Sequence, residues 1–439
     1  MKIKVLDKKT LLVFIVLFLE LIFLGSGYLP GANIAVLFLL LCLFLFPKID
    51  FKFGNLECLI LFYISYLALI TLIKFPSNYD KNNSIMSIVE YLIIFVCCHT
   101  IANNINYDAF VLYIRRIGIL LGLFGIIESI IQTPFLSYLT KQSAVVYTVA
   151  TQYRTVLIFQ HPIVCGVFLL IPLVALIEFP FKSVWKQFLS LGIIVISIIL
   201  TRSRSVWITA LVILAITGFK RFELTSKIAK SKVVHLLQYV FIFLVVISIF
   251  SILLKINVIQ LAMSFINSRI AGSLDAGAGQ GNIIRIETVT NSFDYWFSGN
   301  LSKFIFGMGK NYDKYFLATH PVIKWGVPWA AAIDNQYITT IHESGIIGLA
   351  IIFGIILVTL RRIMTNHLFN NKKSKMKEFV NLCIINIFVT NYFYEGLNYM
   401  SIMTFLWIFI VISDKIEHTD KSTFVKFNQN GLIADKHFY

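Results

Sequence analysis

The chain has 439 residues, of which 58% are hydrophobic and 14% are charged, and its formal net charge is +16 at pH 7. An ordinary soluble domain has roughly 45–50% apolar residues, so this composition excludes that class and indicates a polytopic membrane protein. The basic residues stand in short strings between apolar runs, which argues against a nucleic-acid partner. We therefore expect an all-α integral membrane protein that forms a single domain over residues 1–439.

A membrane-spanning helix needs about 20 largely apolar residues. The first apolar run follows four lysines but lacks a small-residue cleavage site, so we interpret it as a retained helix and not as a signal peptide. By the same length criterion the chain contains about twelve candidate spans. They lie near 11–25, 32–46, 57–73, 85–102, 117–131, 156–177, 187–200, 206–219, 234–254, 339–360, 379–394 and 399–413.

The distribution of lysine and arginine predicts the orientation, because short cytoplasmic loops carry an excess of positive charge. With the N-terminus inside, most basic residues fall in cytoplasmic segments, and the C-terminus is also cytoplasmic. The reverse orientation would invert this bias. The short external loops then hold only Lys74, Lys81, Lys141, Arg154, Arg202 and Arg204.

The stretch TRSRSVW, residues 201–207, joins two apolar runs at the predicted outer face. The positive-inside bias disfavours arginine at that face. Arg202 and Arg204 therefore have two interpretations. They either extend to the lipid headgroups from helix ends or bind an anionic ligand.

One external segment, residues 255–338, is much longer than the other loops, and loops of this length tend to be functional or disordered. Its aromatic content argues against disorder. The stretches NSFDYWFSGN, KFIFGMGKNYDKYF and PVIKWGVPWAAAIDNQY predict short helices and turns with amphipathic faces inside this extracytoplasmic loop.

The polar residues that this topology places at the outer face form an arginine-rich set. Guanidinium groups make bidentate, charge-assisted hydrogen bonds to phosphate oxygens, so the set suits a phosphate-bearing substrate. No Asp-x-Asp or Glu-x-x-His pair occurs in these segments, so we expect neither a metal nor another cofactor. The set comprises Arg154, His161, Arg202, Arg204, Arg269, Arg285, Glu287, His320, Asp334, His342 and Glu343.

Several motifs now carry a family resemblance. FQHPIVCGVFLLIPL with Arg154 before it, then TRSRSVWITALVILAI, RIETVTNSFDYWF, FGMGKNY and DNQYITTIHESGIIGL follow the order of the O-antigen polymerase and ligase family. The chain resembles that family over residues 150–360, and its first five helices match only in hydropathy.

The resemblance implies a helical glycosyltransferase of the bacterial cytoplasmic membrane that acts at the outer face on sugars carried by polyprenyl diphosphate. No metal would be required. Arg204 matches the arginine of the family's Ser-Arg turn and Arg285 its loop arginine, and both would bind the diphosphate together with Arg202 and Arg154. Family ligases usually have His-Asn-x-Tyr-Leu where this chain has Asp334-Asn335-Gln336-Tyr337-Ile338, so the resemblance leaves the identity of the general base open.

The reaction itself requires two kinds of side chain. Fixed cations stabilise the negative charge that develops on a leaving diphosphate, and a carboxylate or imidazole accepts the proton of the incoming hydroxyl. For the proton acceptor we consider Asp334, Glu343, His161 and His342. The two acids also stand near a helix start, where a carboxylate favours the helix dipole whatever its function. His161 heads a helix and equally suits a packing role.

Three functions remain open: a polymerase of lipid-linked repeat units, a ligase that passes the glycan to another acceptor, and a transporter of lipid-linked sugars. Transporters usually have repeated halves with polar sites at the midplane, whereas the polar residues here gather at one face. We therefore favour an enzyme. Its expected partners are a polyprenyl-diphosphate-linked oligosaccharide, membrane lipids, and a chain-length regulator or flippase of the same pathway.

Overall fold

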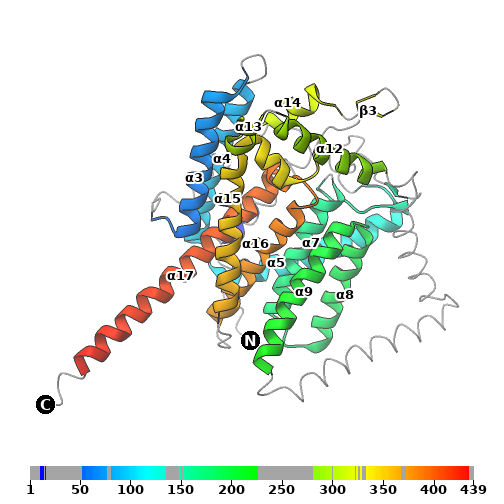
Figure 1. Cartoon of the computed structure of the whole chain (residues 1–439). Coiled ribbons are helices and arrows are strands. Elements are labelled where there is room, and N and C mark those ends of the chain that lie inside the picture. Colours follow the sequence, from blue (N-terminus) through cyan, green and yellow to red (C-terminus); the bar gives the residue numbers. More distant parts are fainter. Residues whose placement is uncertain are drawn as a thin grey trace.

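The computed structural model describes residues 10–13, 15, 52–76, 81–134, 148–149, 152–159, 161–225, 280–298, 300–321, 323–324, 327–328, 333–366 and 372–434. These residues are almost entirely helical, which confirms the all-α fold class (Figure 1). Two antiparallel pairs of two-residue strands are β1 (Thr148–Val149) with β2 (Gln152–Tyr153), and β3 (Ile323–Lys324) with β4 (Val327–Pro328). The helices are α3 (Asn55–Lys74), α4 (Lys81–Asn104), α5 (Tyr107–Ile131), α7 (Pro162–Glu178), α8 (Val184–Leu200), α9 (Arg204–Thr225), α12 (Gln280–Phe297), α13 (Leu301–Phe306), α14 (Tyr312–Thr319), α15 (Gln336–Thr365), α16 (Lys372–Asn391), the 3₁₀ turn η1 (Gly396–Asn398) and α17 (Met400–Ala434).

Four of the described helices, α3, α4, α5 and α15, are long and apolar enough to cross a membrane. Three shorter apolar helices accompany them, at Pro162–Glu178, Val184–Leu200 and Arg204–Gly218. The predicted spans 32–46 and 234–254, and most of 11–25, lie outside the described residues. The total of about twelve spans therefore stays a prediction.

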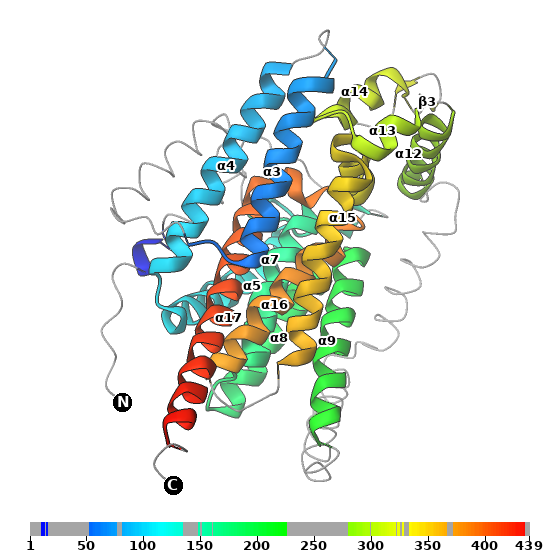
Figure 2. The ribbon, with the colours of Figure 1, turned by 60° about the vertical axis from the view of Figure 1, so that its left-hand side comes forward.

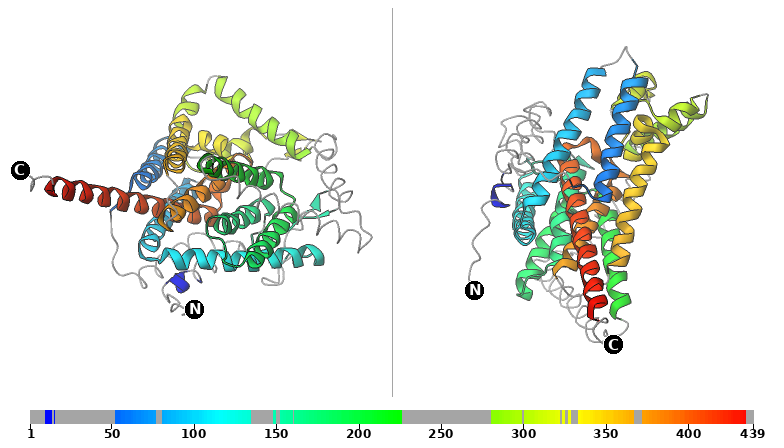
Figure 3. Two further views of the ribbon diagram at one scale, coloured as in Figure 1. Left: turned by 90° about the horizontal axis from the view of Figure 1, so that it is seen from below. Right: turned by 90° about the vertical axis from the view of Figure 1, so that its left-hand side faces the viewer.

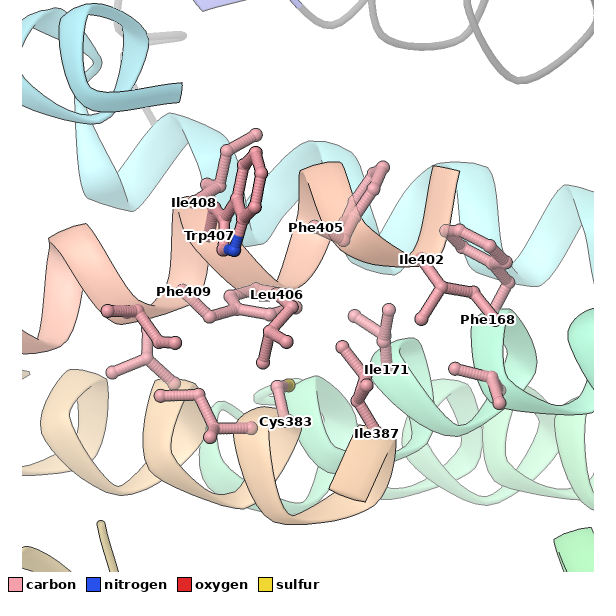
Figure 4. Packing of buried hydrophobic residues seen from close by; sticks show 14 of the residues in the cluster. Phe168, Ile171, Cys383, Ile387, Ile402, Phe405, Leu406, Trp407, Ile408 and Phe409 are labelled. Atoms are coloured by element: carbon pink, nitrogen blue, oxygen red, sulfur yellow. The ribbon is translucent and has the colours of Figure 1, made fainter. Parts of the chain in front are cut away.

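Helix α7 is the centre of the bundle, because nearly every one of its side chains is buried. A helix that is apolar on all sides must be surrounded by other helices. Figure 4 shows Phe168 and Ile171 of α7 facing Cys383 and Ile387 of α16 and the apolar face of α17. Between membrane helices such packing stabilises through van der Waals contact, since the lipid is equally apolar.

The described part of the segment that is predicted to be external forms its own packed layer at one end of the bundle, which we call the external layer. Helices α12, α13 and α14 lie over the start of α15, and the C-terminal part of α17 points to the opposite end (Figures 1 and 2). The short helices expected in this segment are thus present in its described part. Their shared core contains Trp296, Tyr312, Phe316, Leu317, Ile333 and Ile341.

Helix α7 starts at Pro162 and not at residue 156 as the hydropathy predicted. The carboxylate of Glu128, at the end of α5, holds the preceding segment in a non-helical path. Its Oε1 accepts hydrogen bonds from the Tyr153 hydroxyl at 2.9 Å and from the amides of Val156 at 2.7 Å and Leu157 at 3.1 Å. Seen from below, α5 crosses the bundle beside α7 and α8, which brings Glu128 to this segment (Figure 3).

Candidate functional site

The turn between α8 and α9 presents two arginines. Arg202 has a left-handed backbone, with φ of 51°, and its side chain is partly buried. Burial lowers the pKa of the Arg202 guanidinium. Arg204 is exposed and is the first residue of α9. The Ser203 and Ser205 hydroxyls bond each other at 2.8 Å beneath the turn.

Arg154 joins the same turn from a segment almost fifty residues earlier. Its Nε donates to the Thr201 carbonyl at 3.1 Å, and the Thr155 amide donates to the Leu200 carbonyl at 3.1 Å. Three of the four arginines predicted to bind the diphosphate are therefore brought together. We call Arg154, Arg202 and Arg204 the arginine turn. Cations clustered in this way favour an anion such as a phosphate group.

The fourth arginine, Arg285, lies in α12, but its side chain is outside the described part of the chain, as is all of Arg269. Helix α12 is joined to α15 by a hydrogen bond of 2.9 Å between the Ser292 hydroxyl and Nε2 of His342. His342 is buried against aromatic rings, including Phe316 at 4.3 Å between ring centroids. Glu287 and His320 are exposed on this segment.

The stretch Asp334-Asn335-Gln336-Tyr337 forms the start of α15, and three of its residues fix the backbone. The Asn335 side chain caps the helix, accepting from the amides of Tyr337 at 3.0 Å and Ile338 at 3.3 Å. Gln336 accepts from the Leu397 amide at 2.9 Å, and the Tyr337 hydroxyl donates to the Phe388 carbonyl at 2.7 Å. Asn335, and not Asp334, is therefore the residue that caps the helix. Asp334 is partly exposed and has a left-handed φ of 55°.

Glu395, in the connection between α16 and α17, was not among the residues singled out from the sequence. It is buried, and its Oε1 accepts from the Ile333 amide and the Thr339 hydroxyl, both at 2.8 Å. Burial raises the pKa of Glu395, although these hydrogen bonds oppose the shift. The carboxylate thus holds the residues on both sides of Asp334. The sequence does contain one indication of this role: Glu395 is a single acid between two apolar runs. Such a placement is costly in a membrane and often marks a functional residue.

His161 is the N-cap of α7, where its Nδ1 accepts from the Ile163 amide at 3.2 Å. Its ring stacks on Tyr394 with 4.4 Å between centroids. Because Glu395 follows Tyr394 directly, the α16–α17 connection touches both His161 and the segment that carries Asp334. His161 and the segment that carries Asp334 therefore meet at one connection.

Glu343 is held in a buried ion pair that also reaches the α16–α17 connection. Its Oε1 accepts from Lys310 Nζ and from the Asn311 amide, both at 2.8 Å, and Lys310 also bonds Oδ1 of Asn398 at 2.8 Å. Burial alone would lower the pKa of Lys310, yet the carboxylate of Glu343 raises it well above its usual value. Glu343, which is part of α15, thus connects this helix to the loop that precedes α14.

The described residues contain no group of three or more His, Cys, Asp or Glu side chains that could hold a metal ion. The arginine turn is the group at the predicted outer end that is suited to hold an anion. The α16–α17 connection contains Glu395, stacks on His161 and holds the segment that carries Asp334. Lys310, the partner of Glu343, also bonds it.

A comparison of the chain with curated proteins found no match. A family model does match part of the chain. The matched region begins in α8 and ends within α15. It includes Arg202, Arg204, helices α12 to α14 and Asp334. Residues 189–353 match the model described as O-antigen ligase, which confirms that the chain resembles the O-antigen polymerase and ligase family.

Proposed function

We propose that this protein is a glycosyltransferase that moves a glycan from polyprenyl diphosphate to a sugar hydroxyl at the outer face of the bacterial cytoplasmic membrane. The family match supports membrane glycan transfer in general. The observation that carries the finer proposal is the arginine turn, where Arg154 bonds the backbone between α8 and α9. Arginines at a predicted outer face run against the positive-inside bias, which favours a role in binding an anionic ligand.

In the proposed step, the acceptor hydroxyl oxygen forms a bond to the anomeric carbon while the bond from that carbon to the diphosphate oxygen breaks. The electron pair leaves with the diphosphate, whose negative charge grows. Arg204 and Arg202 stabilise this charge more strongly in the transition state than in the ground state. Arg285, which the resemblance matches to the family's loop arginine, is the further diphosphate ligand in this proposal.

Asp334 accepts the proton of the attacking hydroxyl in this proposal. The next three residues and Glu395 hold its backbone, so its carboxylate is positioned without serving as the helix cap. Glu343 is the weaker candidate because its carboxylate is buried in the ion pair with Lys310. His161, stacked on Tyr394, assists substrate placement at the α16–α17 connection.

We favour a polymerase over a ligase because Asp334 replaces the histidine that ligases of the family usually have. The product is then a capsule, exopolysaccharide or O-antigen chain, and a flippase and chain-length regulator act in the same pathway. A ligase remains the second candidate. The two differ in product: a polymerase mutant retains single repeat units on the lipid, whereas a ligase mutant retains finished chains on it.

The test is complementation of a deletion strain with Arg204 variants. Arg204→Ala should reduce polymer formation about 10²–10³-fold, the usual loss for one transition-state hydrogen-bond donor. Arg204→Lys keeps the charge but loses the bidentate geometry, so it should be impaired as well. Asp334→Asn should lower the rate about 10²–10⁴-fold, as expected for loss of a general base. Polymer is measured on gels and lipid-linked repeat units by extraction.

The matched control is Arg361→Ala, which removes an exposed arginine at the far end of α15. Protein abundance should stay unchanged in all four variants, because Arg204, Arg361 and Asp334 lie outside the core. Normal polymer from both Arg204 variants would refute the diphosphate role and leave the arginines as lipid-headgroup anchors.

A further inference from the structure

A cavity of about 740 Å³ lies at the end of the bundle opposite the arginine turn. It is formed where α5 and α16 begin and where the apolar stretch of α17 gives way to charged residues. Membrane helices change from apolar to charged at the boundary between hydrocarbon and water. The cavity therefore lies at headgroup depth, and the predicted orientation makes that leaflet the cytoplasmic one.

A buried arginine with two unbonded nitrogen atoms lines this cavity. Arg115, on α5, is 9% exposed, and its Nε and Nη2 atoms are buried and make no hydrogen bond. Its guanidinium carbon lies 3.7 Å from the centroid of the Phe181 ring, which supplies a cation–π contact but no acceptor. A buried cation is costly unless an anion is paired with it.

Two more cations face the same space. Lys373 of α16 and Lys415 of α17 line it, and Lys415 Nζ donates to the Asn103 carbonyl at 2.7 Å. Asp108 is the single carboxylate among the lining residues, so cations exceed acids by three to one. The walls are otherwise mainly apolar, with Val111 of α5 among them. A basic centre with apolar walls matches a lipid whose headgroup carries a phosphate.

We infer that this cavity binds the phosphate headgroup of an anionic phospholipid of that leaflet, with Arg115 as the central contact. The lipid would pair the buried guanidinium and fill the space between α5, α16 and α17. Basic pockets between transmembrane helices bind anionic lipid headgroups by this chemistry. The site is separate from the proposed reaction, since it lies at the other end of the bundle.

The test measures thermal unfolding of the purified full chain in neutral detergent as phosphatidylglycerol is added. Adjacent arginines supply a matched pair, because Arg115 is buried and Arg116 is exposed. Phosphatidylglycerol should raise the Tm of the wild type and of Arg116→Gln equally. Arg115→Gln should need at least about tenfold more lipid for the same shift, the effect of one lost hydrogen bond to a charged group.

Phosphatidylcholine and inorganic phosphate serve as comparison ligands and should leave the Tm unchanged. A Tm rise from phosphate alone, no response of the wild type to phosphatidylglycerol, or equal losses in both arginine variants would each overturn the lipid site. Lys373→Gln is the second variant and should also weaken the response. In neutral detergent, Arg115→Gln should unfold no earlier than the wild type, because it removes an unpaired buried charge.

Discussion

At the scale of single residues, Asp313 in α14 is a buried acid in unfavourable surroundings. It is 1% exposed, and its Oδ1 makes no hydrogen bond. Burial, with the nearby carboxylates of Glu343 and Glu395, raises the pKa of Asp313 to about 8, against a reference value of 3.8. The folded protein therefore keeps this carboxyl protonated at pH values where the unfolded chain releases the proton.

We predict that this acid makes folding stability fall as pH rises. Between about pH 4 and pH 8 the folded state binds one more proton than the unfolded state, so stability decreases by up to about 1.4 kcal/mol per pH unit. Asp313→Asn, which cannot ionise, should remove this slope. Its Tm advantage over the wild type should grow from pH 5 to pH 8 and then level off. The exposed Asp294→Asn is the control, and a pH-independent difference for Asp313→Asn would contradict the prediction.

The pairing of Arg202 with Arg204 was predictable from the sequence because both lie in one short turn between two apolar runs. The roles of the acids were not predictable. Glu343 pairs with Lys310, and Glu395 reaches Ile333, sixty-two residues earlier. Such pairs depend on tertiary packing, and neither spacing nor hydropathy indicates them. The sequence therefore predicts which side chains are available for chemistry but not which of them are held in structural ion pairs and hydrogen bonds.

At the scale of elements, the break in α15 joins the external layer to the bundle. Gly345 has φ of 66° inside this helix, and the break leaves carbonyl groups available to the loop before α14. The Met308 amide donates to the His342 carbonyl at 3.0 Å, and the Gly309 amide donates to the Glu343 carbonyl at 2.8 Å. A hydropathy pattern predicts α15 as a continuous span and does not reveal this break.

We predict that Gly345→Ala detaches the external layer. A Cβ atom at this position would lie 2.2 Å from the Ile305 carbonyl oxygen, and the positive φ disfavours any side chain. The variant should lower the Tm by several degrees and expose residues 300–321 to limited proteolysis. Gly354→Ala is the control, because a Cβ there meets nothing within 4 Å. Equal Tm and digestion patterns for the two variants would show that α15 does not need its break.

At the scale of the whole molecule, the described helices and the external layer place two basic sites at opposite ends. The arginine turn lies at one end, and the cavity with Arg115 lies at the other. The reaction proposed for the first site requires the outer face, where lipid-linked sugars and their acceptors meet. The lipid proposed for the second site then belongs to the cytoplasmic leaflet. Both assignments depend on the orientation predicted from the lysine and arginine bias.

Impermeant maleimide labelling of right-side-out spheroplasts tests that orientation with two matched substitutions. Ser302→Cys lies in α13 of the external layer, and Ser183→Cys lies just before α8 at the other end, and both positions are exposed. The exposed native Cys58 is first replaced by serine, while the four other described cysteines are buried. Ser302→Cys should react in intact spheroplasts, whereas Ser183→Cys should react only after lysis. The opposite pattern would put the arginine turn in the cytoplasm, where positive charge needs no ligand to explain it, and the proposed external transfer would lose its basis.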